Sequence, residues 1–228
     1  MIEFKTNPNS TRINSCEIDK LIGFIFSNKK YIKITINILA RVRYNINDKN
    51  ELNSTIDNDP ISELVIKDEH IDEYKSVMYD FYNCDDDVLN KRRGRLLEKI
   101  MDRIGVINNI IEFDKIEEAL VYKNGVLISK KDIDTVYNGN KIELQECKAT
   151  LTNNCRPPFY KNNSDRKKFE LMNSIRDHVD NGIEVFPYLV TYSTSTKKCL
   201  RFLARYNINN LMIISGNDIE ELCNRSFG

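Results

Sequence analysis

The segment of residues 131–150 is the part of the sequence that most restricts the fold. Asn138-Gly139 is a strong signal for a tight turn, and it separates two runs in which apolar and polar side chains alternate. Alternation with a period of two is typical of β-strands. The segment therefore predicts two strands joined by a hairpin.

The predicted hairpin also gathers groups that can do chemistry. Side chains alternate across a strand, so Glu146 and Lys148 share one face and Cys147 lies on the other. Asp132 and Asp134 are likewise two residues apart, on the neighbouring strand. Carboxylates and a lysine on one face of a sheet form a group that a divalent cation can use.

Length and composition set limits on the rest of the chain. The 228 residues suffice for one large domain, or for one domain with a smaller appendage. The 34 basic and 34 acidic residues balance, so any binding of nucleic acid must come from local clusters. The six cysteines contain no CxxC pair, which argues against a disulfide framework and a structural zinc site. We expect a soluble, cytoplasmic protein that does not enter a membrane.

The remaining patterns predict an α/β fold, in which helices flank a sheet. Helical periodicity predicts helices at 16–27, 67–84, 88–105, 164–179, 196–206 and 218–224. Strands are expected at 119–122, 126–129, 183–192 and 211–214. The pattern at 31–44 is ambiguous, and the alternation of isoleucine with polar residues from Ile32 to Ile38 favours a strand there. Polar composition predicts loops at 47–60 and 151–163.

The predicted helix at 88–105 carries two further features. Arg92, Arg93 and Arg95 crowd its first half, where the helix dipole disfavours positive charge. They indicate either phosphate binding or an ordinary solvated face, and the sequence does not separate these alternatives. Glu98 lies at the edge of the apolar stripe of the same helix.

The order of these features resembles the core of the PD-(D/E)xK superfamily, the restriction-endonuclease-like nucleases. A helix with a glutamate is followed by antiparallel strands with an acid and then an acid-x-lysine triplet, and after these by a helix and a strand. The resemblance covers roughly residues 88–215. The triplet alone is not specific, because the chain contains three others.

The resemblance implies a metal-dependent nuclease that hydrolyses the phosphodiester bonds of DNA or RNA. It assigns catalytic roles to Glu98, Asp134, Glu146 and Lys148. Mg²⁺ or Mn²⁺ would be bound by Glu98, Asp134, Glu146 and the backbone carbonyl of Cys147. A shorter likeness to the nuclease domains of CRISPR-associated ancillary effectors and of some restriction systems implies a role in genome defence or DNA processing. Because superfamily members often form homodimers, the resemblance also implies a homodimer.

This reading divides the chain into an N-terminal mixed or helical region of unknown role, residues 1–87, and a nuclease-like domain, residues 88–228. Two alternatives stay open. The hairpin can instead be an edge hairpin with surface salt bridges between its charged side chains. The chain can also be a non-catalytic nucleic-acid-binding or assembly subunit on a degenerate nuclease fold, which would bind through Arg92, Arg93 and Arg95.

Overall fold

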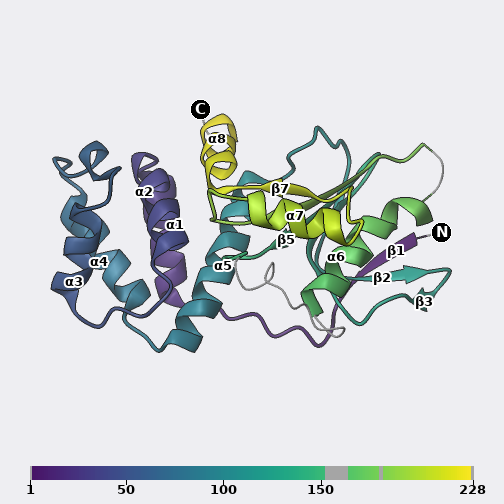
Figure 1. The fold of residues 1–228 in the computed structure, drawn as a ribbon, viewed down its shortest axis with the longest axis horizontal. Coiled ribbons are helices and arrows are strands. Elements are labelled where there is room, and N and C mark those ends of the chain that lie inside the picture. Colours follow the sequence, from purple (N-terminus) through teal and green to yellow (C-terminus); the bar gives the residue numbers. More distant parts are fainter. Residues whose placement is uncertain (1, 152–163, 180–181, 227–228) are drawn as a thin grey trace. The chain divides into compact units, whose positions relative to one another are not determined.

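A computed structural model describes residues 2–151, 164–179 and 182–226 (Figure 1). The chain forms two compact units. One combines Met1–Thr11 with Gly105–Ser215, and the other combines Arg12–Ile104 with Gly216–Gly228. The predicted division was a single cut before residue 88, whereas these units interleave along the chain. The first eleven residues belong with the sheet because β1 pairs with a strand more than a hundred residues later.

The first unit contains a seven-stranded mixed sheet, so it belongs to the α/β class as predicted. The strands are β1 (Ile2–Thr6), β2 (Asp114–Lys123), β3 (Val126–Leu127), β4 (Ile133–Asn138), β5 (Ile142–Cys147), β6 (Val185–Val190) and β7 (Met212–Ile214). Their order is β1-β2-β4-β5-β6-β7, with β3 paired to β2. Pairing is antiparallel from β1 to β5 and parallel from β5 to β7. Figure 1 shows β2 between β1 and β3.

The predicted hairpin is confirmed as β4 and β5, and it lies inside the sheet. All six residues of β5 are buried, between β4 on one side and β6 on the other. The alternative of an edge hairpin with surface salt bridges is therefore wrong. Gly139 is needed at the turn because an added Cβ would stand 2.9 Å from the carbonyl oxygen of Glu112.

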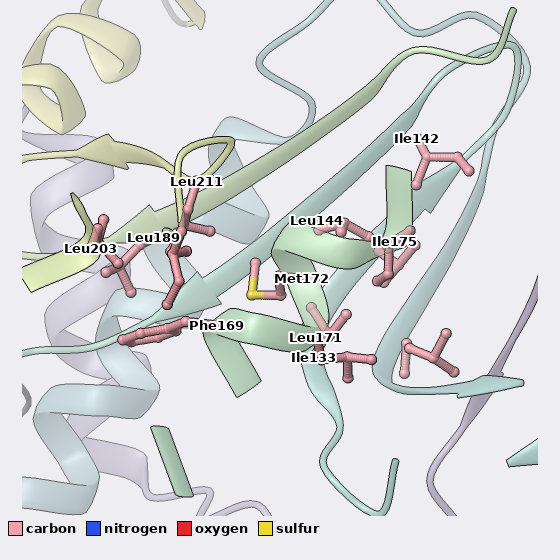
Figure 2. Packing of buried hydrophobic residues seen from close by; sticks show 14 of the residues in the cluster. Ile133, Ile142, Leu144, Phe169, Leu171, Met172, Ile175, Leu189, Leu203 and Leu211 are labelled. Atoms are coloured by element: carbon pink, nitrogen blue, oxygen red, sulfur yellow. The ribbon is translucent and has the colours of Figure 1, made fainter. Parts of the chain in front are cut away.

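Among the described residues of this unit there are also two helices and a 3-10 turn: α6 (Ser164–Ser174), η2 (Ile175–His178) and α7 (Lys197–Arg205). Their apolar side chains join those of the sheet in one buried cluster, part of which Figure 2 shows. There Phe169 and Met172 of α6 pack near Leu144 of β5 and Leu189 of β6. The predicted loop at 151–163 lies outside the described residues except for Leu151, which is buried.

The opposite face of β5 carries a buried polar network. The carboxylate of Glu143 is fully buried and accepts hydrogen bonds from the backbone N–H groups of Ile107 and Asn108, at 3.0–3.1 Å, and from the side chains of Asn108 and Gln145. The Asn108 amide also donates to the hydroxyl of Tyr188, at 2.7 Å. Buried polar groups need such partners, so Glu143 fixes the segment that enters the sheet unit.

The second unit is helical. It contains α1 (Cys16–Ser27), α2 (Lys30–Arg41), α3 (Lys49–Asp57), η1 (Ser62–Leu64), α4 (Ile71–Tyr82), α5 (Asp86–Ile104) and α8 (Gly216–Ser226). The predicted helices at 16–27, 67–84, 88–105 and 218–224 are confirmed, with shifted ends. None of the described helices combines the length and the apolarity that crossing a membrane requires.

Two predictions in this unit are wrong. The expected strand from Ile32 to Ile38 is part of α2, in which seven of twelve residues are buried. The helical period is present as well, because the residues that are not buried, Lys30, Lys33, Asn37, Ala40 and Arg41, recur at helical spacing. The alternation of isoleucine masked this period, and tertiary packing overrides the strand preference of isoleucine. The expected loop at 47–60 contains α3, whose N-cap Asp48 accepts a hydrogen bond from the Asn50 N–H.

Candidate functional site

A charged cluster lies at the carboxyl end of β5. Strand alternation places Glu146 on the same face as Ile142 and Leu144, toward α6, yet its side chain is fully buried. The backbone N–H of Lys148 donates to the carbonyl of Val190, at 2.8 Å, which extends the pairing of β5 with β6 by one residue. Nζ of Lys148 is then 3.0 Å from Oε1 of Glu146.

Two aspartates of the predicted hairpin join this cluster, Asp134 of the predicted site and Asp132, which was not assigned to that site. Oδ2 of Asp134 accepts a hydrogen bond from the backbone N–H of Cys147, at 2.7 Å, which ties β4 to the end of β5. Asp132, just before β4, accepts a hydrogen bond from Nδ2 of Asn7, at 2.8 Å. The structure therefore brings Asp134, Glu146 and Lys148 together as expected, and it adds Asn7, which the sequence analysis missed.

Helix α6 supplies two more charged groups that sequence reasoning missed. Nζ of Lys168 is 2.8 Å from Oε1 and 2.9 Å from Oε2 of Glu146, and 3.7 Å from an oxygen of both Asp132 and Asp134. Asp165, one turn earlier, is 3.3 Å from Nζ of Lys148. Four carboxylates thus face two ammonium groups, an excess of two negative charges when all are ionised.

The helix periodicity contained a signal for these two residues. Phe169 and Met172 were expected to point inward, and Lys168 precedes Met172 by four residues while Asp165 precedes Phe169 by four. Residues spaced in this way share a helix face. A lysine and an aspartate that extend an apolar stripe toward a sheet were therefore candidates for the site.

Burial and mutual charge shift the titration of the cluster. Burial, assisted by the neighbouring Asp134 carboxylate, raises the pKa of Glu146, whereas the two lysines oppose this shift. Burial acts to lower the pKa of Lys148 and of Lys168, but Glu146 and Asp134 outweigh it and raise both pKa values. Both lysines are therefore charged at neutral pH and compensate a carboxylate that is costly to bury alone.

The donor atoms of the cluster suit a hard divalent cation, because Mg²⁺ and Mn²⁺ prefer carboxylate oxygens. Among residues 2–151, 164–179 and 182–226, no three carboxylate, thiol or imidazole groups already stand close enough together to hold a metal ion. The carboxylates of Asp132, Asp134 and Glu146 converge instead on the ammonium of Lys168. The carboxylate oxygens are suitable ligands for Mg²⁺ or Mn²⁺, but the ammonium of Lys168 lies between them.

Glu98, the fourth predicted catalytic residue, belongs to the helical unit. Its Oε2 is 2.7 Å from Nη1 of Arg95 and 3.5 Å from Nε of Arg12. Its role in catalysis or in metal binding stays a prediction.

The arginines of α5 have structural partners within the helical unit. The guanidinium of Arg92 donates to the carbonyls of Asp80 and Phe81, at 3.0 and 2.9 Å, in the last turn of α4. Arg93 donates to the carbonyl of Leu39, in the last turn of α2. Phosphate binding and a solvated face both presuppose exposed side chains, whereas Arg92 and Arg93 are buried. They satisfy the unpaired carbonyls of two helix ends, which explains their place on α5.

The substitution Arg93→Met should therefore lower the free energy of unfolding by about 2–3 kcal/mol, since it leaves a buried carbonyl without its charged donor. Chemical denaturation measures this loss. Lys91→Met is the matched control, because Lys91 is exposed on the same helix and its loss should cost less than about 0.5 kcal/mol. Equal stability of the two variants would contradict a structural role for Arg93.

The chain was also compared with known proteins. No protein-family model matches it, and a search of curated proteins finds no match. The candidate site must therefore be judged on its own geometry.

Proposed function

We propose that this protein is a metal-dependent nuclease of the PD-(D/E)xK type, acting on DNA or RNA. The observation that carries the proposal is the buried Glu146 at the end of a central strand, within 3.0 Å of Lys148 and close to Asp134 through the Cys147 N–H. A buried carboxylate among opposite and like charges is typical of functional sites.

The strand arrangement supports the same proposal. Antiparallel β2, β4 and β5 are followed along the chain by α6 and by β6, which pairs parallel to β5. This is the order of strands and helix expected for a restriction-endonuclease-like core. Two of the acids named by the resemblance, Asp134 and Glu146, are on β4 and near the end of β5, which supports the proposal.

The chemistry follows from the residues. Asp134, Glu146 and the carbonyl of Cys147 would hold Mg²⁺ or Mn²⁺, which neutralises charge on a phosphoryl group and lowers the pKa of a bound water. Lys148 would stabilise negative charge that develops on the scissile phosphate, or orient the attacking water. Asp165, at 3.3 Å, holds the Lys148 ammonium in place and leaves it 25% exposed, so a substrate can reach it.

A non-catalytic subunit is the second candidate, and one observation favours it. The ammonium of Lys168 already pairs with Glu146 and lies near Asp132 and Asp134, so one cation holds these three acids together without a metal. Burial of Arg92 and Arg93, however, removes two of the three arginines through which such a subunit would bind nucleic acid.

The direct test is to incubate the purified protein with plasmid DNA, single-stranded DNA and RNA, each with Mg²⁺, Mn²⁺ or EDTA. We expect cleavage of at least one substrate with a metal and none with EDTA. Asp134→Asn should abolish that cleavage. Metal-independent binding without cleavage of any of the three would favour the non-catalytic subunit. The resemblance also implies a homodimer, which size-exclusion chromatography with light scattering would test.

A further inference from the structure

Lys168 lies at the point on which three carboxylates of the cluster converge. Its Nζ contacts both oxygens of Glu146, at 2.8 and 2.9 Å, and stands 3.7 Å from Asp132 and from Asp134. The side chain is only 10% exposed, so solvent screens these charges weakly. One cation from α6 thus compensates acids from two strands and the segment before β4.

A metal ion bound by the same oxygens would compete for the same place. Magnesium binds oxygen at about 2.0–2.1 Å, so an ion held by Asp134 and Glu146 would stand close to the Lys168 ammonium. Positive charges at such a distance in a buried site repel each other strongly. Lys148 is placed differently, because it contacts Oε1 of Glu146 and Asp165 and is 25% exposed.

We infer that Lys168 is a built-in competitor of the metal ion: its ammonium holds Asp132, Asp134 and Glu146 together without metal and is displaced when a divalent cation binds. The inference rests on the proposed function, since it presumes that the cluster binds a metal. The four-carbon stem of lysine is flexible. The ammonium can therefore withdraw while Phe169 and Met172 keep α6 packed on the sheet.

This arrangement keeps the acidic cluster folded when metal is scarce, and it lowers the apparent metal affinity. The affinity of a site is reduced by the fraction of molecules in which that site is open. Removing the competing ammonium should therefore raise metal affinity, which is the opposite of what loss of a ligand or of a supporting residue would do.

The test compares Lys168→Met with Lys167→Met by calorimetric titration with Mn²⁺. Methionine matches the lysine side chain out to Cε and removes the charged Nζ, and Lys167 is the exposed neighbour on α6. We expect Lys168→Met to bind Mn²⁺ about tenfold or more tightly than the wild type, and Lys167→Met to match the wild type. Melting in EDTA should show Lys168→Met to be the least stable of the three and the most stabilised by added Mn²⁺.

A crystal structure of the wild-type protein with Mn²⁺ provides a second test that needs no variant to fold. Nζ of Lys168 should then lie more than about 4 Å from the Glu146 oxygens, beyond ion-pair distance. An ammonium that keeps its contacts beside bound Mn²⁺ would overturn the inference, as would unchanged or weaker Mn²⁺ binding by folded Lys168→Met. If one of these results is found although the wild type binds Mn²⁺ and cleaves, only the role inferred for Lys168 is wrong. If neither the wild type nor Lys168→Met binds Mn²⁺, the proposed function is wrong as well.

Discussion

The substitution Glu146→Gln should abolish Mn²⁺ binding and, because cleavage depends on the metal, should abolish nuclease activity as well. Glu146 contacts both lysines of the cluster, Lys148 at 3.0 Å and Lys168 at 2.8 Å, and it is fully buried. Glutamine keeps the shape of the side chain but removes the charge that a metal ion requires. Calorimetric titration with Mn²⁺ and a cleavage assay measure the two effects.

Glu143→Gln is the matched control, because Glu143 is also a fully buried glutamate of β5. Strand alternation places it on the opposite face, where it accepts hydrogen bonds from Ile107, Asn108 and Gln145. Its substitution should cost about 1.5–3 kcal/mol of stability, the worth of hydrogen bonds to a charged group, and leave Mn²⁺ binding intact. If both variants lose activity equally while folded, the cluster is not the active site.

A feature of this site can be predicted from the sequence when the residues that determine it are close together in the chain. The hairpin was predictable because the turn residues and the alternation lie within one segment of twenty residues. Its burial was not, because a central position depends on β6, which follows some forty residues later in the chain. Alternation marks the two faces of β5 but does not tell an exposed face from a covered one.

The residues missed by the sequence analysis differ in the same way. Lys168 could have been predicted, since it lies one turn before Met172 on the predicted inward face of α6. Asn7 could not, because its bond to Asp132 joins residues 125 apart in sequence and depends on the pairing of β1 with β2. For the arginines of α5, the sequence suggested a function where the structure shows a structural role. Their charge suggested a phosphate partner, whereas their partners are carbonyls at the ends of two other helices.

The substitution Lys148→Met should lower the cleavage rate by about 10²- to 10³-fold, as removal of one group that stabilises a developing charge does. Mn²⁺ binding should not weaken, because Lys148 supplies no oxygen and stands 3.0 Å from one oxygen of Glu146. Single-turnover cleavage at saturating Mn²⁺ separates the loss of rate from any change in metal affinity.

Lys141→Met is the control for Lys148→Met, since Lys141 lies just before β5 and pairs with Glu184 at the other end of the strand. It should cleave at the wild-type rate. The most informative contrast is with Lys168→Met. If Lys148→Met kept full activity and Lys168→Met lost it, Lys168 of α6, and not Lys148, would be the residue that stabilises the developing charge. Because Lys148 is 25% exposed and Lys168 only 10%, we expect the substrate phosphate to meet Lys148.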